Sequence, residues 1–119
     1  MKPLEKRPIR WLKKEAWKKF SAFIRSRDPN CFTCENKTNC AGHWRHGHTK
    51  AGYLDERNIN GQCSRCNLFL SGNGTVYSLK MAKKYGLKEA EKMWKEFSKD
   101  HIFKRKELIN IIKKYKKTI

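Results

Sequence analysis

Two closely spaced cysteine pairs lie in the middle of this 119-residue chain. Cys31 and Cys34 form one Cys-x-x-Cys pair, and Cys63 and Cys66 form the second after the 28 intervening residues 35–62. The two-residue gap lets both thiolates of a pair approach one side of a tetrahedral Zn²⁺ ion, so two pairs supply four ligands. A zinc ion held by four thiolates has no open coordination position and takes no part in a reaction. We therefore predict one structural zinc site.

The fifth cysteine, Cys40, makes the count odd, which argues against a framework of disulfides. The sequence MKPLEKRPIRWLKK has no apolar segment of the kind found in signal peptides, so we expect reduced thiols in a cytoplasmic protein. Cys40 could replace one of the paired thiols, but we expect it to pack as a small apolar residue near the zinc.

Three histidines, His43, His46 and His48, lie between the cysteine pairs. A single histidine in a loop is usually only a polar residue, whereas three close together are compatible with metal binding or acid–base chemistry. Because the cysteines already satisfy the zinc, these side chains are available for a second task.

The charge of the chain indicates a polyanionic partner. Lys and Arg number 29 against 11 Asp and Glu, a net charge of +18. Residues 1–27 hold ten basic and two acidic side chains, residues 75–119 hold fourteen and five, and residues 28–74 hold five and four. Clustered cations of this kind neutralise nucleic-acid phosphates, although a solvated basic surface or an anionic membrane surface would also fit. The predicted DNA contacts are Lys13, Lys14, Lys18, Lys19, Arg45, Lys113, Lys114, Lys116 and Lys117.

The elements that would position these residues can be read from periodicity and turn residues. Residues 10–28 have the apolar spacing of an amphipathic basic helix that ends at Asp28-Pro29. The glycine-rich segment 31–62 is typical of loops and a small β-hairpin, and residues 64–72 fit a short helix. Two helices separated by Gly86 and a final basic helix over 103–119 complete a single domain of α+β class, mostly helical. No apolar run approaches the length of a membrane span.

The combined motifs resemble a known family. The stretches CFTC, AGHWRHG and DERNINGQCSRCNLFLSGN, with FSAFIRSRD upstream and VYSLKMAKKYG downstream, are similar to the phage NinG (Rap) recombination endonucleases over roughly residues 16–98. That family is a divergent form of the HNH, or ββα-metal, nucleases. The resemblance implies a zinc-stapled ββα-metal (HNH/treble-clef-like) core over 31–74, with a basic helix before it and basic helices over 75–119.

The resemblance also implies a function. The protein would be a phage or prophage endonuclease in a bacterial host, hydrolysing phosphodiester bonds of branched recombination intermediates such as Holliday junctions and D-loops. Its cofactors would be structural Zn²⁺ and catalytic Mg²⁺ or Mn²⁺, and symmetric cutting of two strands would call for a homodimer.

Individual roles transfer to matching positions. His43 falls on the general base, Asn67 on a ligand of the catalytic ion, and Asn58 on the residue that braces the loop carrying His43. Many HNH enzymes place an Asp ligand before that histidine, where this chain has Gly42. A second ligand would then come from His46, which we assign, or from His48, Asp55 or Glu56, unless phosphate and water hold the ion.

A function of a different class is a non-catalytic zinc-stapled DNA-binding protein, which would keep the cysteines and basic helices but need neither His43 nor Asn67. Replacing His43 by Ala separates the two, since only a nuclease would lose an activity while still binding DNA. A third class, an RNA-binding ribosome-associated zinc protein, fits the charge but not the spacing of the AGH and CN motifs.

Overall fold

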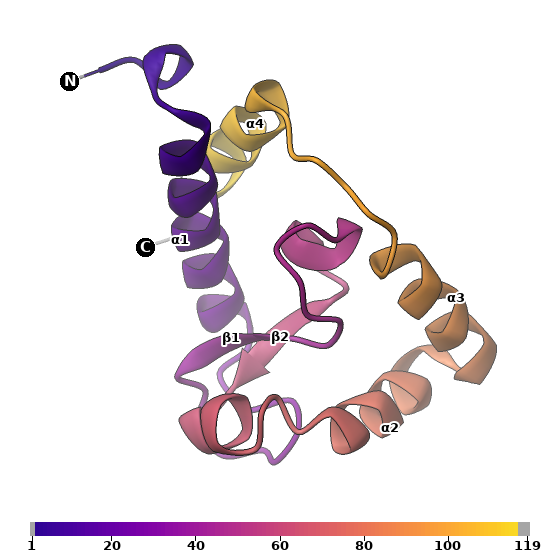
Figure 1. Ribbon diagram of the computed structural model, residues 1–119. Coiled ribbons are helices and arrows are strands. Elements are labelled where there is room, and N and C mark those ends of the chain that lie inside the picture. The colour runs from indigo at the N-terminus through magenta and orange to yellow at the C-terminus, as the bar shows by residue number, and fades with distance from the viewer. Residues whose placement is uncertain (1, 117–119) are drawn as a thin grey trace.

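The computed structural model describes residues 2–116, which form a mostly helical α+β chain around one small sheet (Figure 1). After a 3₁₀ turn at Leu4–Lys6, helix α1 spans Ile9–Arg27 and confirms the predicted N-terminal helix. Its buried face carries apolar side chains four residues apart, which is the repeat of one helix face: Leu12, Ala16, Phe20 and Ile24. The helix ends where predicted, before Pro29.

Helix α4, Arg105–Tyr115, packs along α1. The Arg105 guanidinium donates to the carbonyl of Arg7, which precedes α1, whereas the Tyr115 ring meets Phe20 and Phe23 near the end of α1. The two helices therefore run in the same direction. The last helix of the basic segment 75–119 thus lies against α1. The residues expected to extend this helix, 117–119, lie outside the described part of the chain.

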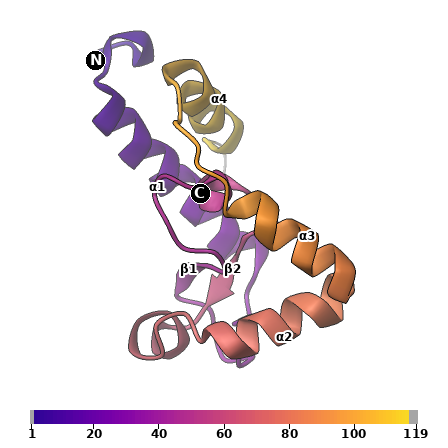
Figure 2. The same cartoon turned by 45° about the vertical axis from the view of Figure 1, so that its right-hand side comes forward.

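Helices α2, Gly74–Tyr85, and α3, Leu87–Phe97, form a second pair on the other side of the sheet (Figures 1 and 2). The chain turns between them at Gly86, whose φ of 91° favours glycine. Buried Tyr77 joins this pair to the sheet, because its hydroxyl donates to the carbonyl of Gly42 and accepts from Asn60. Two helices separated at Gly86 were predicted from the sequence.

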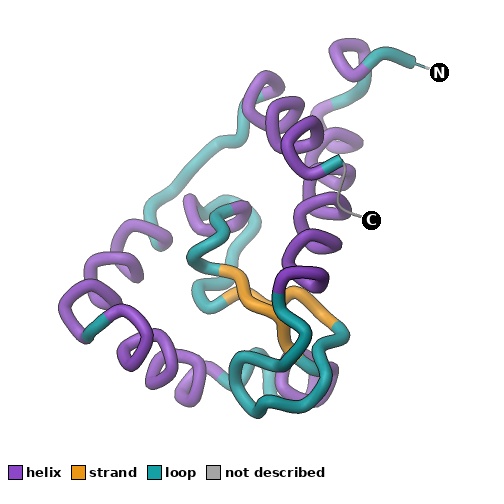
Figure 3. Tube along the Cα trace, turned by 180° about the vertical axis from the view of Figure 1, so that it is seen from behind, coloured by secondary structure: helices purple, strands orange, loops and turns teal. Residues whose placement is uncertain are grey.

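The predicted hairpin is present as strands β1, Cys40–His43, and β2, Ile59–Gln62, which pair antiparallel with Cys40 opposite Gln62 and His43 opposite Ile59. A 3₁₀ turn at Ala51–Leu54 lies in the long connection between them. The loop that leads from α1 to β1 lies below the strands in the view from behind (Figure 3). The hairpin thus lies between the two helix pairs.

The short helix expected over 64–72 is a single π turn, Arg65–Phe69, with a bond from the Leu70 amide to the Arg65 carbonyl. Three positive φ angles follow at Ser71, Gly72 and Asn73, which prevents the turn from continuing as a helix. No helix within residues 2–116 is long and apolar enough to cross a membrane.

Candidate functional site

The two cysteine pairs meet at one point. The four sulfur atoms of Cys31, Cys34, Cys63 and Cys66 all lie within 4.8 Å of one another. A tetrahedral zinc ion with bonds of about 2.3 Å needs sulfurs about 3.8 Å apart, so the cluster fits such an ion. The first pair follows α1 and the second follows β2, so a bound metal would tie the helix to the hairpin.

Hydrogen bonds around the cluster favour thiolates. The Cys66 amide points at the Cys63 sulfur, and the Thr33 hydroxyl lies 3.3 Å from the Cys31 sulfur. Burial raises the pKa of Cys31, but the bonds from Thr33 and from backbone amides outweigh it and lower the pKa to about 6. The Asn36 amide favours the Cys34 thiolate, yet burial and the neighbouring sulfurs raise its pKa to about 12. A divalent cation that binds these four sulfurs would displace the remaining protons from the thiols.

Cys40 lies outside this cluster. Its sulfur is 4.0 Å from the Ser64 hydroxyl, at the start of β1, and the side chain is half-buried. Cys40 is therefore not one of the four clustered thiols.

His43, at the end of β1, lies in a cluster of three nearly parallel rings. Its ring centroid is 4.8 Å from that of Trp17 on α1 and 5.3 Å from that of Tyr53, while Trp17 and Tyr53 are 5.6 Å apart. Burial lowers the pKa of His43 to about 4, with smaller contributions from His46 and His48. The imidazole is therefore neutral at physiological pH.

The tautomer of His43 follows from its hydrogen bond. Its Nε2 atom is 3.0 Å from the carbonyl oxygen of Tyr53. Because a carbonyl can only accept, Nε2 carries the proton and Nδ1 keeps the lone pair. A neutral imidazole with an oriented lone pair can accept a proton from water.

Asn58 is fully buried and holds the segment that follows His43. Its amide oxygen accepts from the Arg45 amide at 2.8 Å, and its nitrogen donates to the carbonyls of Arg45 and Gly52 at 2.9 and 2.8 Å. A side chain at Gly52 would begin 2.6 Å from the Asn58 nitrogen, so this close approach requires glycine. Asn58 thus joins the segment after His43 to the 3₁₀ turn at Ala51–Leu54.

Gly42, where a carboxylate ligand is missing, has no room for a side chain. A Cβ atom there would lie 1.9 Å from Oε1 of Gln62. Gln62 is fully buried, and its nitrogen donates to Thr33 Oγ1 and to the Gly72 carbonyl, while Oε1 has no partner among the described residues. The Gln62 side chain, on β2, thus links the loop that carries Cys31 and Cys34 to the segment after the π turn.

The remaining candidates for a ligand of the catalytic ion lie in three different places. Asp55 is bound to Arg57, and Glu56 to Tyr115 and Lys114, beside α4. His48 packs against Tyr53. His46 lies beside His43, with ring centroids 6.3 Å apart, and its Nε2 atom is 2.9 Å from the position that a Cβ at Gly72, after the π turn, would take.

Asn67 lies on the π turn, which contacts β1, and its side chain makes no hydrogen bond to residues 2–116. Within that range only the four cysteines form a cluster of three or more His, Cys, Asp or Glu ligands. The described residues therefore bring together four thiols at distances that fit one metal ion, and they form no second cluster of that kind.

The basic residues predicted to contact DNA occupy the α1–α4 pair and the loop after β1. Lys14, Lys18, Lys113 and Lys116 are exposed, whereas Lys19 pairs with Glu15, and Lys13 donates to the His48 carbonyl. Lys114 lies 3.5 Å from Glu56. Arg45 is held by Ser98 and by the His46 carbonyl. Lys117 lies outside the described residues.

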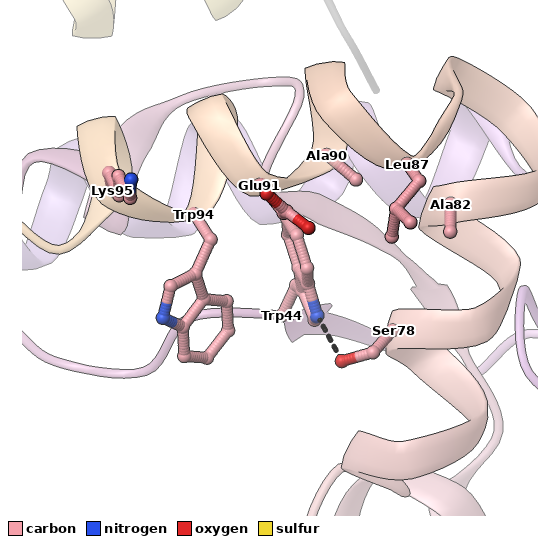
Figure 4. Close-up of a pocket in the computed structure, with 8 residues that line it drawn as sticks. All are labelled: Trp44, Ser78, Ala82, Leu87, Ala90, Glu91, Trp94 and Lys95. Atoms are coloured by element: carbon pink, nitrogen blue, oxygen red, sulfur yellow. Dashed lines mark hydrogen bonds between the residues drawn. The ribbon is translucent and has the colours of Figure 1, made fainter.

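A hollow of about 380 Å³ lies between α2 and α3 over Trp44 (Figure 4). The Trp44 indole donates to the Ser78 hydroxyl, and the Trp94 ring lies edge-on to it. Adjacent residues of an extended chain point to opposite faces, so Trp44 faces α2 and α3 while His43 faces α1. This hollow is therefore separate from the histidine site.

Three residues of the site were not found from the sequence. Trp17 lies in the stretch 10–28, whose apolar spacing predicts a helix, and neither Tyr53 nor Gln62 belongs to a spacing that points to a site. Each contributes through contacts with residues distant in the chain, and no local pattern signals them.

Comparison with known proteins agrees with the motifs. The profile of a family described as the bacteriophage lambda NinG protein matches residues 2–119. No curated protein and no solved structure matches the chain. Because the match covers nearly every residue, including both cysteine pairs and the AGH segment, the chain belongs to the bacteriophage lambda NinG family.

Proposed function

We propose that this protein is a metal-dependent DNA endonuclease of HNH type that hydrolyses phosphodiester bonds in branched recombination intermediates. The observation that carries the proposal is the state of His43. A half-buried imidazole with a pKa of about 4, protonated on Nε2 and with its lone pair on Nδ1, has the protonation state of a general base.

The low pKa of His43 has a further consequence for catalysis. A base this weak is fully deprotonated at neutral pH but gains little by accepting a proton. Phosphates of bound DNA would add negative charge near the ring, and a nearby negative charge raises the pKa of histidine. His43 would therefore become a stronger base when substrate is bound.

A divalent cation would bind weakly to the free protein. Asn67 and His46 are the side chains that would hold it, and Mg²⁺ commonly uses one or two protein ligands together with substrate phosphate and water. Once bound, Mg²⁺ or Mn²⁺ would stabilise negative charge on the scissile phosphate and on the leaving 3′-oxygen. Asn58 and the zinc cluster would hold His43 and the π turn in position.

The test is cleavage of a labelled four-way junction and a matched linear duplex, with Mg²⁺, with Mn²⁺ and without added divalent ion. We expect metal-dependent nicking of the junction by the wild type and loss of at least about a hundredfold in rate for His43→Gln, within the range expected for a general base. His101→Gln is the matched control, because His101 pairs with Glu107 away from the site.

Zinc content and junction binding would be measured for each variant, so that a loss of cleavage is not a loss of folding. Binding of the junction without cleavage in either metal, by the wild type as well, would contradict the proposal. It would instead favour a non-catalytic zinc-stapled DNA-binding protein.

A further inference from the structure

A groove of about 800 Å³ lies beside the His43 ring cluster. It runs along the N-terminal half of α1 and the residues before it, and its far wall contains His48 and Tyr53. Its volume is within the roughly 300–1,000 Å³ of pockets that bind ligands. The groove is therefore large enough to take part of a polymer.

The charges along the groove have one sign. No Asp or Glu side chain lines it, and the charged residues that do are all cations: Lys2, Arg7, Arg10, Lys13 and Lys14. The acidic residue of this part of α1, Glu15, pairs with Lys19 and does not line the groove. A concave surface with unopposed cations is complementary to a phosphate backbone.

The floor of the groove is aromatic. Trp11, Trp17 and Tyr53 line it, with the Arg7 guanidinium 4.3 Å from the Trp11 ring centroid and the Lys13 ammonium 5.3 Å from that of Tyr53. Bases of a duplex are stacked on one another and cannot offer their faces to rings in a groove, whereas an unpaired strand can. Cations that follow a backbone and aromatic rings that stack bases together characterise single-strand sites.

We propose that this groove binds a short unpaired DNA strand, with a base stacked on Trp11. The inference rests on the proposed nuclease function, because a D-loop, one of the proposed substrates, contains a displaced strand that is unpaired. Trp17 and Tyr53 line the groove and also stack on His43, so a strand in the groove ends beside the imidazole. The groove would thereby select branched substrates by an element that linear duplex lacks.

The test is the binding of a short fluorescein-labelled oligothymidine and of a linear duplex to the full chain, without divalent ion. We expect Trp11→Ala to weaken oligothymidine binding roughly five- to a hundredfold, as for the loss of one stacked base, and duplex binding less than about threefold. Trp94→Ala is the matched control, since Trp94 is a 40 % exposed tryptophan on α3 outside the groove. An equal effect of Trp11→Ala and Trp94→Ala, or an equal effect on strand and duplex, would overturn the proposal.

A second measurement does not depend on the folding of a variant. An oligonucleotide with 5-iodouracil, crosslinked to the wild type by light and mapped by mass spectrometry, should attach to peptides containing Trp11, Trp17 or Tyr53. Attachment only elsewhere would contradict the groove, and tighter binding of the equivalent RNA strand would contradict a DNA ligand. Neither measurement needs cleavage, so a protein without nuclease activity could still bind the strand, and an active nuclease could fail to bind it here.

Discussion

Oε1 of Gln62 occupies the space in which a side chain at position 42 would have to begin, 1.9 Å from the ideal Cβ position of Gly42. The strands place these residues two register steps apart, because Gly42 pairs with Asn60 and Cys40 with Gln62. The packing of Gln62 against Gly42 therefore leaves no space for a carboxylate side chain immediately before His43. A carboxylate could not be restored at this position without moving Gln62.

Gly42→Ala should lower the free energy of unfolding by about 1–3 kcal/mol, the usual range for overpacking a well-filled interior. Urea unfolding followed by circular dichroism would measure it. Gly74→Ala is the matched control, since a Cβ at Gly74 meets nothing within 4 Å and glycine is unfavourable within a helix. In Gly42→Ala combined with Gln62→Ala, the two losses should not add. A Gly42→Ala protein as stable as the wild type would show that Gln62 moves aside freely.

The zinc cluster predicts one zinc ion per chain, measured by atomic absorption of the purified protein. Cys63→Ser should lose the metal and cooperative unfolding with it, because structural zinc contributes about 10–16 kcal/mol of apparent binding free energy in small domains. Cys40→Ser should keep the ion, since Cys40 lies outside the cluster. Loss of zinc in Cys40→Ser, or its retention in Cys63→Ser, would contradict the assignment of ligands.

Asn58→Ala should lower the free energy of unfolding by about 3 kcal/mol, because one buried and two partly buried backbone groups would lose their hydrogen bonds at once. Asn110→Ala, at an exposed position of α4, should change stability by less than about 0.5 kcal/mol. Denaturant unfolding would compare the two. Junction cleavage by Asn58→Ala should also fall below the wild-type rate at temperatures where the variant is still folded. An Asn58→Ala protein with wild-type stability and activity would contradict the proposed bracing role of Asn58.

The stability of the protein should depend on pH through His43. Its folded pKa of about 4 lies below the unfolded value of about 6.5, so between these values the unfolded chain binds more protons. The free energy of unfolding should therefore fall as pH decreases from 6.5 to 4, by roughly 3 kcal/mol from this group.

His43→Gln lacks this titration, so its stability should decrease less than that of the wild type over the same range. Zinc release at acid pH affects both proteins, and the difference between the two curves isolates the histidine. Denaturant midpoints at several pH values would provide it. Parallel curves of unfolding free energy against pH for the two proteins would contradict the lowered pKa of His43.

The sequence by itself determined the features that depend on local order. The repeat of apolar residues at three and four positions located α1, Pro29 located its C-terminal end, and Gly86 located the turn between α2 and α3. The Cys-x-x-Cys spacing located the metal cluster, because the ligands of each pair are neighbours in the chain. The motifs also indicated the family, which the match over residues 2–119 confirmed.

Only the tertiary structure decided the features that depend on residues far apart in the chain. No local pattern reveals that α4 returns to lie along α1, that Gln62 fills the space at Gly42, or that Trp17 and Tyr53 surround His43. The π turn at 65–69 is likewise set by the contacts at its end, where Gln62 holds the Gly72 carbonyl. Packing brings these groups together through burial and hydrogen bonds that have no period in the sequence, and it alone gives His43 its pKa of about 4.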